Sequence, residues 1–284
     1  MTRLTQSHMQ ETLLQLERID DMLRVRVTTG LRGVALRTIG VKEDEANTVS
    51  SKRVAVVPIT VGEGVIPGFA ETVKAIACQI GIDARVTRAS DVSGIAEAYT
   101  GDNDIVILAD DLRFVAINAR SGAIVDNDRA TGEGFAKLLE MMAKGVDGCP
   151  CGVIGCGPVG TAAAFRLVRM GATLTVCDLN EERGRRLVAR IREECNTETA
   201  WVGEVTALLS NCRFIVDATP AAGIVPADAI RPDTVITAPG VPVGLTLEAL
   251  DRIGLRYYHD NLPLGVATMV LAAVFGKMTE LSKH

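Results

Sequence analysis

The chain of 284 residues is poor in aromatic side chains and carries no excess of positive charge. Aromatic residues make up 4% of the sequence, and the formal net charge is −5. Proteins that bind nucleic acids need a basic surface, and binders of single strands add aromatic side chains on which bases stack. The sequence contains no stretch dense in lysine and arginine with interleaved aromatics. It therefore gives no support to nucleic-acid binding.

Long uncharged stretches are also missing. The apolar, uncharged stretch over residues 261–276 is shorter than the roughly 20 apolar residues needed to cross a bilayer, and Pro263 interrupts its beginning. The first twenty residues include Arg3, Glu11 and Arg18, so they lack the apolar segment of a secretory signal. We therefore expect a cytoplasmic protein that does not bind membranes and that buries its last helix.

Histidine is scarce, with three in the chain, and the cysteines form no recognisable framework. The seven cysteines are Cys78, Cys149, Cys151, Cys156, Cys177, Cys195 and Cys212. Their odd number and apolar surroundings favour reduced, buried thiols. Cys149 and Cys151 are separated by one residue and no second pair answers them, so we expect no metal site.

What the sequence does contain is an alternation of short apolar runs with helical patterns, which predicts an α/β protein. We expect an amphipathic helix over 6–24, a looser glycine-containing segment, a loop over 41–52 and a helix over 134–143. Strands are predicted at 54–57, 84–87, 104–109, 114–118, 152–154, 173–177, 214–216, 235–237 and 255–258. The predicted domains are a small N-terminal helical and α/β domain (1–146) and a Rossmann-type doubly wound parallel-sheet domain with the C-terminal helix (147–284).

The strongest motif is the glycine-rich turn from Gly155 to Gly160, which follows a predicted strand and opens a predicted helix. Gly155 permits the tight turn, Gly157 leaves room for a pyrophosphate, and Gly160 allows close packing of helix and strand. Pro158 and Val159 begin the helix, whose N-terminus attracts phosphate. The alternative is a glycine-rich turn that binds nothing.

A second predicted strand ends in Asp178, at the distance from the turn where dinucleotide-binding proteins place an acidic residue. Its carboxylate is expected to accept hydrogen bonds from the adenosine ribose and to repel the additional phosphate of NADP, which favours NAD. Arg183, Arg185 and Arg186 follow and offer charges for NADP, but a solvated helix face explains them more simply.

Two later turns, 217–220 and 238–240, each follow a predicted strand. A doubly wound sheet holds its ligand at the carboxyl ends of its strands. We therefore expect Thr219, Pro220, Pro239 and Gly240 to border the ribose and nicotinamide of the cofactor. Ordinary loop chemistry is the alternative, because proline and glycine end many strands.

The N-terminal half must supply the substrate side. Asp110 follows the very apolar run 105–108 and precedes Asp111. Two carboxylates after a buried strand are well placed to meet a cationic substrate. A pair of solvated turn residues is the alternative. His259, after the last predicted strand, is a further acid–base candidate, although a loop histidine without a catalytic role explains it as well.

These features resemble the pyrrolysine synthase (PylD) family over roughly residues 50–275. The resemblance rests on Val57-Pro58-Ile59-Thr60 with Gly62, Gly64, Ile66 and Phe69; on Asp91-Val92-Ser93-Gly94; on Ala109-Asp110-Asp111 with Phe114 and Asn118; on Thr131-Gly132; and on Gly155–Gly160, Ala218-Thr219-Pro220, Pro239-Gly240 and Gly265–Met269. The N-terminal motifs are the specific part, since many dehydrogenases share the glycine-rich turn and the acidic residue.

The resemblance implies NAD-dependent oxidation of the terminal amine of 3-methyl-D-ornithyl-N6-L-lysine, followed by closure of the pyrroline ring of L-pyrrolysine. It implies that Asp110 is catalytic and that Asp110, Asp111, Asn118 and Thr60 bind this small amino-acid-derived substrate. Three alternatives stay open at this point: another NAD-dependent amino-acid dehydrogenase, an imine reductase, and a non-catalytic NAD-binding module. A homo-oligomer is compatible with the sequence.

Overall fold

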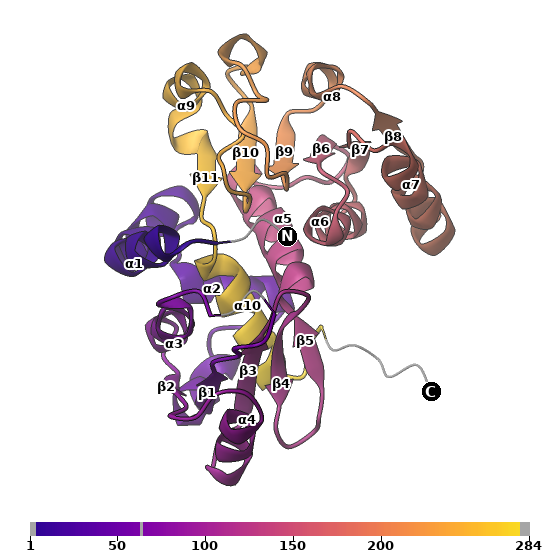
Figure 1. Cartoon of the computed structure of the whole chain (residues 1–284). Helices are drawn as coiled ribbons and strands as arrows, with labels where there is room; N and C mark the ends of the chain where they lie inside the picture. The colour runs from indigo at the N-terminus through magenta and orange to yellow at the C-terminus, as the bar shows by residue number, and fades with distance from the viewer. Residues whose placement is uncertain (1–3, 63–64, 279–284) are drawn as a thin grey trace. The chain divides into compact units, whose positions relative to one another are not determined.

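The structure is a computed structural model that describes residues 4–62 and 65–278, and the chain divides into two compact units (Figure 1). Unit 1 consists of residues 4–130 together with 262–278, and unit 2 consists of residues 131–261. This division differs from the one expected at residue 146. It assigns the last helix, α10 (Pro263–Val274), to unit 1, because that helix packs on elements of the N-terminal part.

Unit 1 is built around a five-stranded sheet in the order β2-β1-β3-β4-β5. The strands β2, β1 and β3 are parallel, whereas β4 and β5 run antiparallel to their neighbours because only short connections join them. The strands are β1 (Arg53–Val57), β2 (Asp83–Val86), β3 (Ile105–Ala109), β4 (Phe114–Asn118) and β5 (Ile124–Asp126). The helices are α1 (Gln6–Val27), α2 (Leu31–Ile39), the 3-10 helix η1 (Glu45–Ser51), α3 (Phe69–Gln79), α4 (Asp91–Thr100) and α10, and α5 (Asn127–Ala143) leads into unit 2.

The glycine-containing segment that was expected to be loose forms the helix α2. Two of its glycines mark the helix ends, with Gly30 as the N-cap and Gly40, at φ +71°, as the C-cap, whereas Gly33 lies buried within the helix. Asp20 of α1 accepts a hydrogen bond from the backbone N–H of Leu31 at 2.7 Å, which satisfies a free donor of the first turn of α2. The loop expected over 41–52 likewise contains η1.

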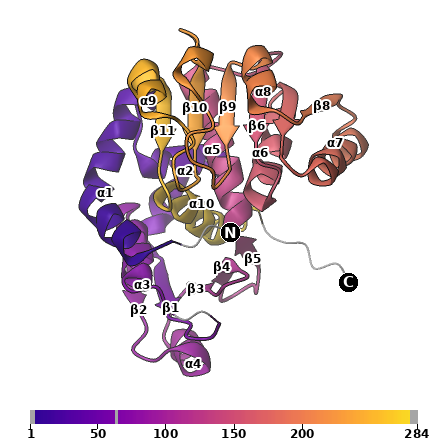
Figure 2. The ribbon, with the colours of Figure 1, turned by 45° about the horizontal axis from the view of Figure 1, so that its top comes forward.

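The helix α10 is hydrophobic on all sides and accounts for the long uncharged stretch. Every residue from Pro263 to Ala273 is buried, and the helix contacts α2, α3, β4 and β5 (Figures 1 and 2). A side-chain bond adds to this packing, since Nδ2 of Asn118 donates to the carbonyl oxygen of Ala273 at 3.1 Å. Within 4–62 and 65–278, no helix is long and apolar enough to cross a membrane.

Unit 2 contains six parallel strands in the order β11-β10-β9-β6-β7-β8, which confirms the predicted Rossmann-type sheet (Figure 1). The strands are β6 (Pro150–Ile154), β7 (Thr173–Cys177), β8 (Thr199–Val202), β9 (Phe214–Asp217), β10 (Val235–Ala238) and β11 (Tyr257–His259). The helices are α6 (Pro158–Arg169), α7 (Glu181–Cys195), α8 (Val205–Asn211), α9 (Leu247–Ile253) and the 3-10 helices η2 (Ala227–Ala229) and η3 (Gly254–Arg256). The strand order reverses between β6 and β9, and doubly wound sheets bind ligands at such a point.

Candidate functional site

The glycine-rich turn joins β6 to α6 at the carboxyl edge of the sheet of unit 2. Gly155 has a φ of +90°, and a Cβ atom built on it would lie 2.8 Å from the carbonyl oxygen of Ala218. A Cβ on Gly160 would lie 1.8 Å from the carbonyl oxygen of Gly155, so only glycine fits there. A Cβ on Gly157 would meet no atom within 4 Å. The turn is therefore closed at its two ends and open at Gly157, next to the N-terminus of α6, where Pro158 and Val159 begin the helix.

Asp178 follows β7 directly and is held beside this turn. Its Oδ2 accepts a hydrogen bond from the backbone N–H of Cys156 at 2.7 Å, and its Oδ1 accepts one from Asn180 at 2.8 Å. Carboxylate oxygens have two lone pairs each, so both can also accept from ribose hydroxyls. The guanidinium of Arg183 lies 3.8 Å from Oδ2.

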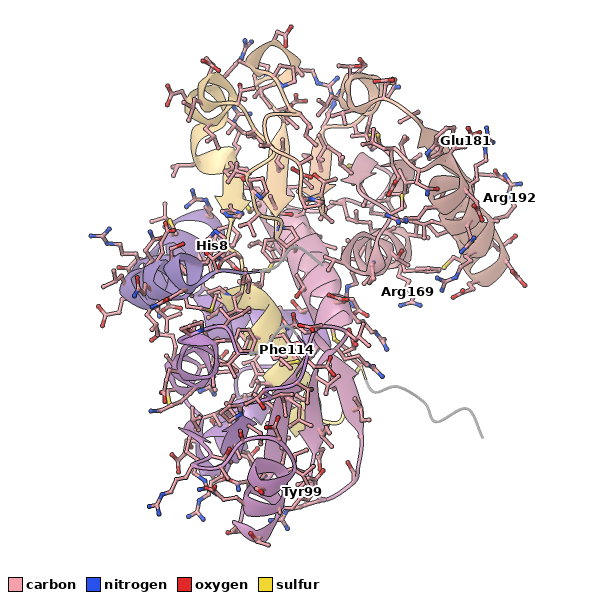
Figure 3. The ribbon with its side chains drawn as sticks, in the orientation of Figure 1. His8, Tyr99, Phe114, Arg169, Glu181 and Arg192 are labelled. Carbon is pink, nitrogen blue, oxygen red and sulfur yellow. The ribbon has the colours of Figure 1, made fainter. Side chains whose placement is uncertain are left out.

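Arg185 and Arg186, which were considered as possible partners for the additional phosphate of NADP, form ion pairs within the helix α7. Arg185 donates to Glu181 at 2.6 Å and Arg186 pairs with Glu182, and all four side chains are more than half exposed. Glu181 and Arg192 lie on the solvent side of the same helix (Figure 3). These arginines therefore belong to a solvated helix face with i,i+4 ion pairs.

Thr219 lies between the glycine-rich turn and the turn that contains Pro239 and Gly240. A Cβ on Gly240 would lie 2.1 Å from the carbonyl oxygen of Thr219, and one on Gly155 would lie 3.0 Å from its Cγ2. The two glycines thus bring the ends of β6, β9 and β10 together. Pro220 beside Thr219 is exposed, and Pro239 is half-buried. A role for these four residues in cofactor binding stays a prediction.

Two ionisable residues lie at the carboxyl ends of β9 and β11. Asp217 is only 1% exposed, and burial raises the pKa of its carboxyl group to about 6. Nδ1 of His259 lies 2.8 Å from the carbonyl oxygen of Ala238, and its ring stacks on Tyr257 at 6.3 Å between centroids. The sequence places Asp217 in a turn expected to border the cofactor but assigns it no role of its own. Its position after an apolar strand was visible, but its burial depends on the surrounding loops.

The carboxyl edge of the sheet of unit 1 carries aspartate side chains. Oδ1 of Asp110 accepts hydrogen bonds from the backbone N–H groups of Arg113 at 2.7 Å and Leu112 at 2.8 Å. These two bonds lower the pKa of this exposed carboxyl group, so it is ionised at neutral pH. A Cβ on Gly62 would lie 2.0 Å from Oδ2 of Asp111, so the loops after β1 and β3 are in contact.

Thr60 joins the same edge through Asp91. Its backbone N–H and its hydroxyl both donate to the Asp91 carboxylate, at 2.7 and 2.6 Å, and these bonds lower the pKa of Asp91. The hydroxyl proton of Thr60 is therefore engaged, and its oxygen lone pairs are left for a ligand. Glu63 and Gly64, at the centre of this loop, lie outside the described residues.

Asn118 lies at the other end of β4 and has structural partners. Its Oδ1 accepts hydrogen bonds from the backbone N–H groups of Arg120 at 3.1 Å and Ser121 at 3.0 Å, which stabilise the turn between β4 and β5. Its Nδ2 binds Ala273 of α10. The register of the sheet places Asn118 opposite Ile105, the first residue of β3, whereas Asp110 follows the last. The structure does not bring Asn118 together with Asp110, and its substrate-binding role stays a prediction.

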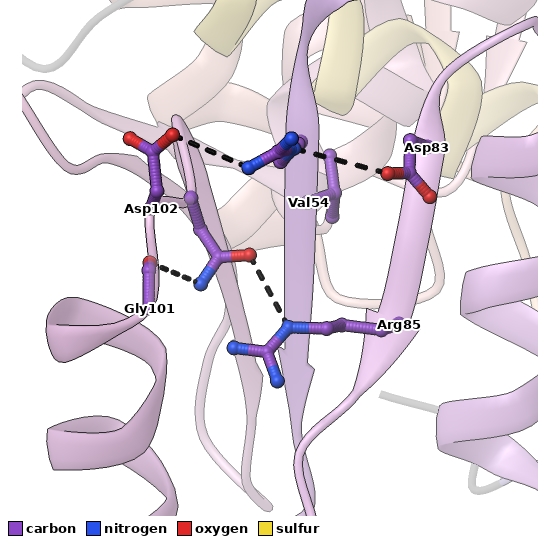
Figure 4. Close-up of a pocket in the computed structure, with 7 residues that line it drawn as sticks. Val54, Asp83, Arg85, Gly101 and Asp102 are labelled. Atoms are coloured by element: carbon purple, nitrogen blue, oxygen red, sulfur yellow. Dashed lines mark hydrogen bonds and ion pairs between the residues drawn. The ribbon is translucent and has the colours of Figure 1, made fainter.

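A hollow of about 350 Å³ lies at the amino ends of β1 and β2, away from these aspartates (Figure 4). Its charged groups are already paired: Arg53 lies 3.2 Å from Asp102 and 4.0 Å from Asp83, and Arg85 lies 3.3 Å from Glu97. Mutual neutralisation of this kind is typical of a structural surface rather than a ligand site. Among the described residues, no group of three histidine, cysteine or acidic side chains is placed to hold a metal ion.

The parallel sheet with its glycine-rich turn and acidic residue defines the class of protein, an NAD-dependent oxidoreductase. Residues 130–241 match the family described as alanine dehydrogenase/PNT, C-terminal domain. Solved structures with the same fold include quinate dehydrogenase from Corynebacterium glutamicum in complex with NAD (TM-score 0.54, 15% identity, covering 82% of this chain and 96% of that one). They also include shikimate dehydrogenase from Aquifex aeolicus (TM-score 0.55, 16% identity, covering 81% and 94%).

Residues 8–125 match the family described as pyrrolysine biosynthesis protein PylD, N-terminal domain. The chain is 29% identical over 270 residues to a pyrrolysine synthase from Methanosarcina acetivorans, with coverage of 95% of this chain and 98% of that one. It is 26% identical over 274 residues to the pyrrolysine synthase from Methanosarcina barkeri, with coverage of 96% and 98%. The predicted resemblance to pyrrolysine synthase is thereby confirmed, and it extends along nearly the whole chain.

Proposed function

We propose that the protein oxidises the terminal amine of 3-methyl-D-ornithyl-N6-L-lysine with NAD and forms the pyrroline ring of L-pyrrolysine. The observation that carries the proposal is the match of residues 8–125 to the PylD N-terminal domain, because this segment holds Asp110 and Asp111. Carboxylates at the end of β3 suit a substrate whose reacting group is a cation in water. The cofactor-binding half alone supports only a dehydrogenase of some kind.

The chemistry assigns Asp110 an electrostatic role. Hydride leaves a neutral amine, yet an alkylammonium group has a pKa near 10.4 and a neighbouring carboxylate raises that pKa further. Loss of hydride to NAD converts the amine carbon to an iminium, which is positively charged. Asp110, ionised because backbone N–H groups bind it, orients the amine and stabilises this developing charge. Water is the proton acceptor in this scheme.

Ring closure needs no further oxidant. The α-amine of the ornithyl group attacks the iminium carbon, ammonia leaves, and a cyclic imine results. Hydrolysis of the iminium to an aldehyde gives the same ring with water as the last leaving group. Either route yields one NADH and one pyrroline for each substrate.

The test is formation of NADH, followed by its absorbance, when the protein is mixed with NAD and methyl-ornithyl-lysine, with the product mass measured in parallel. We expect NADH and the pyrroline in equal amounts. NAD binding without NADH would discard this substrate. NADH formed only from other amino acids would favour another amino-acid dehydrogenase.

The Asp110→Asn variant tests the assigned role. Asparagine keeps the acceptor for Leu112 and Arg113, so the loop should hold its shape while the charge is lost. We expect kcat/KM to fall roughly a hundredfold with the NAD affinity unchanged. Asp102→Asn, which removes an exposed carboxylate at the opposite end of the sheet, is the matched control and should keep wild-type kcat/KM. Unchanged kcat/KM in Asp110→Asn would contradict the assignment.

A further inference from the structure

Asp217, the last residue of β9, is a buried carboxylate that the proposed reaction does not use. Its Oδ1 accepts two hydrogen bonds from Thr219, one from the backbone N–H at 3.2 Å and one from the hydroxyl at 2.7 Å. A Cβ on Gly244 would lie 1.9 Å from Oδ2, so the backbone of the loop after β10 covers the other oxygen. A charge buried to 1% exposure without a compensating function is destabilising, which calls for a reason for its presence.

Thr219, which donates both of these hydrogen bonds, is held in one orientation. Its backbone and methyl group are fixed between Gly155 and Gly240, so the hydroxyl is the polar part of the side chain left to meet a ligand. A hydroxyl has one proton and two lone pairs. Because the proton is donated to Asp217, a ligand finds only an acceptor at the Thr219 oxygen.

We propose that Asp217 is a positioning residue that fixes Thr219 as a hydrogen-bond acceptor for a donor group on the nicotinamide riboside half of NAD. The inference rests on the proposed function in requiring that NAD be the cofactor. Two donors of that half have this chemistry, the carboxamide N–H and the ribose hydroxyls. The end of β9, next to the reversal of strand order, is where a doubly wound sheet receives the second half of a dinucleotide.

The orientation of the Thr219 hydroxyl does not depend on the charge of Asp217. Both hydrogen bonds go to Oδ1, so a proton taken up by the carboxyl group resides on Oδ2 and leaves Oδ1 an acceptor. The titratable groups that act on Asp217 electrostatically are Tyr257 and His259 of β11. On the neighbouring strand β6, the residue paired with Asp217 is Ile154, which carries no charge.

The two hydrogen bonds between Thr219 and Asp217 determine which substitutions are conservative and which are disruptive. Asparagine at 217 keeps Oδ1 as the acceptor, because an amide nitrogen in that place would face the backbone N–H of Thr219. Alanine removes the acceptor and frees the hydroxyl. Asp217→Asn and Thr219→Ser are therefore the conservative variants. Asp217→Ala and Thr219→Val are the disruptive ones, and Thr219→Val leaves the buried carboxylate in place should Asp217→Ala fail to fold.

The experiment measures the dissociation constants of NAD, ADP-ribose, ADP and 3-acetylpyridine adenine dinucleotide for the full chain and the four variants. We expect Thr219→Val and Asp217→Ala to weaken NAD roughly tenfold, the loss of one good hydrogen bond, and to leave ADP within about twofold. Asp217→Asn and Thr219→Ser should bind NAD like the wild type. If ADP-ribose is weakened as much as NAD, the donor is a ribose hydroxyl.

A carboxamide donor gives a different pattern. The acetylpyridine analogue has a methyl group in place of the amide nitrogen, so the wild type should bind it more weakly than NAD, and Thr219→Val should abolish that preference. Equal loss of ADP and NAD in the disruptive variants would overturn the inference, because it indicates general damage to the site. Unchanged NAD affinity in Thr219→Val would overturn it as well. NAD binding in this pattern without turnover of methyl-ornithyl-lysine would contradict the proposed function alone.

Discussion

The two sheets present opposite chemistry at their carboxyl edges. In unit 2 the edge is shaped by missing side chains: Gly155, Gly160 and Gly240 bring three turns into backbone contact, and Gly157 leaves open space. In unit 1 the edge is shaped by side chains that backbone groups hold, because Asp110 accepts from N–H groups of its own turn and Asp91 accepts from the N–H of Thr60 in the loop after β1. One edge therefore suits an anionic ligand that approaches the backbone closely, and the other suits a cation.

The two units also differ in the families they resemble. Unit 2 matches a domain shared with alanine dehydrogenases, whereas unit 1 matches a domain described for PylD. A glycine-rich turn and its acidic residue bind the pyrophosphate and the ribose, which all dinucleotide cofactors of this type contain. The aspartates of unit 1 stand on two loops, Asp91 after β2 and Asp110 and Asp111 after β3, and in the proposed function their charge selects the substrate. Specificity for the substrate is therefore expected to reside in unit 1, and substitutions at the two edges should have different effects.

The largest effect is expected where a side chain is added at the glycine edge. The Cβ atom of Gly160→Ala would lie 1.8 Å from a backbone oxygen, so α6 must move away from β6. We expect a loss of about 3 kcal/mol or more in the free energy of unfolding, together with loss of NAD binding. Urea denaturation and calorimetric titration with NAD measure the two quantities.

Gly157→Ala is the matched variant, since it adds the same methyl group where no protein atom lies within 4 Å. Its φ of −69° suits alanine. The free energy of unfolding should therefore stay within about 0.5 kcal/mol of the wild type, while NAD affinity falls at least roughly tenfold. Wild-type NAD affinity in this variant would show that the pyrophosphate does not pass Gly157.

A second pair of substitutions contrasts a carboxylate from each edge. Burial raises the pKa of Asp217 to about 6 in the folded protein, above the roughly 3.9 of an unfolded chain. The native state then binds the proton more tightly, so the wild type loses stability as pH rises from about 4 to 6, by roughly 3 kcal/mol. Asp217→Asn does not titrate. Its stability relative to the wild type should increase over that interval, as measured by urea denaturation at several pH values.

For Asp110→Asn, the stability relative to the wild type should decrease, not increase, as the pH rises. The pKa of Asp110 is lowered in the folded state, so its contribution to stability is present above the unfolded pKa and disappears as the pH falls through the folded one. The variant should be slightly less stable than the wild type at neutral pH and equal to it in acid. If the stability of both variants relative to the wild type changed in the same direction with pH, the two carboxylates would not differ in the way that their surroundings predict.

Local patterns in the sequence predicted much of the fold. Apolar runs located nearly all strands of both sheets, and the glycine turn and Asp178 predicted the Rossmann-type unit. The edge strands β5 and β8 were missed because neither contains a clear apolar run: β5 has two apolar residues before an aspartate and asparagine cluster, and β8 begins with Thr199 after a charged segment. The helix α5 begins at Asn127, well before the expected residue 134. The prediction placed its start too late because a cluster of aspartate and asparagine residues is as typical of a turn as of the first turn of a helix.

Long-range properties were not predictable. The partners of α10 lie in unit 1, far away in the sequence, so its all-round hydrophobicity gave its burial but not its neighbours. Asp217 was visible as the residue after an apolar strand, yet its importance comes from the loop at Gly244 that covers it. Thr60 was expected to contact substrate directly, and its bond to Asp91, 31 positions away, appears only in the fold.

The smallest effect is expected at Cys156, the one side chain with a reactive group inside the glycine turn. It is 4% exposed, and burial together with the nearby Asp178 raises the pKa of its thiol to about 12. The thiolate is the reactive form, so iodoacetamide at about pH 8 should label the exposed Cys78 well before Cys156, as peptide mass spectrometry would show. Cys156→Ala should change NAD affinity by less than about twofold, because the edge of unit 2 presents its backbone to the ligand. Rapid labelling of Cys156 with loss of NAD binding would contradict this prediction, because it would show that the Cys156 side chain is accessible at the site where NAD binds.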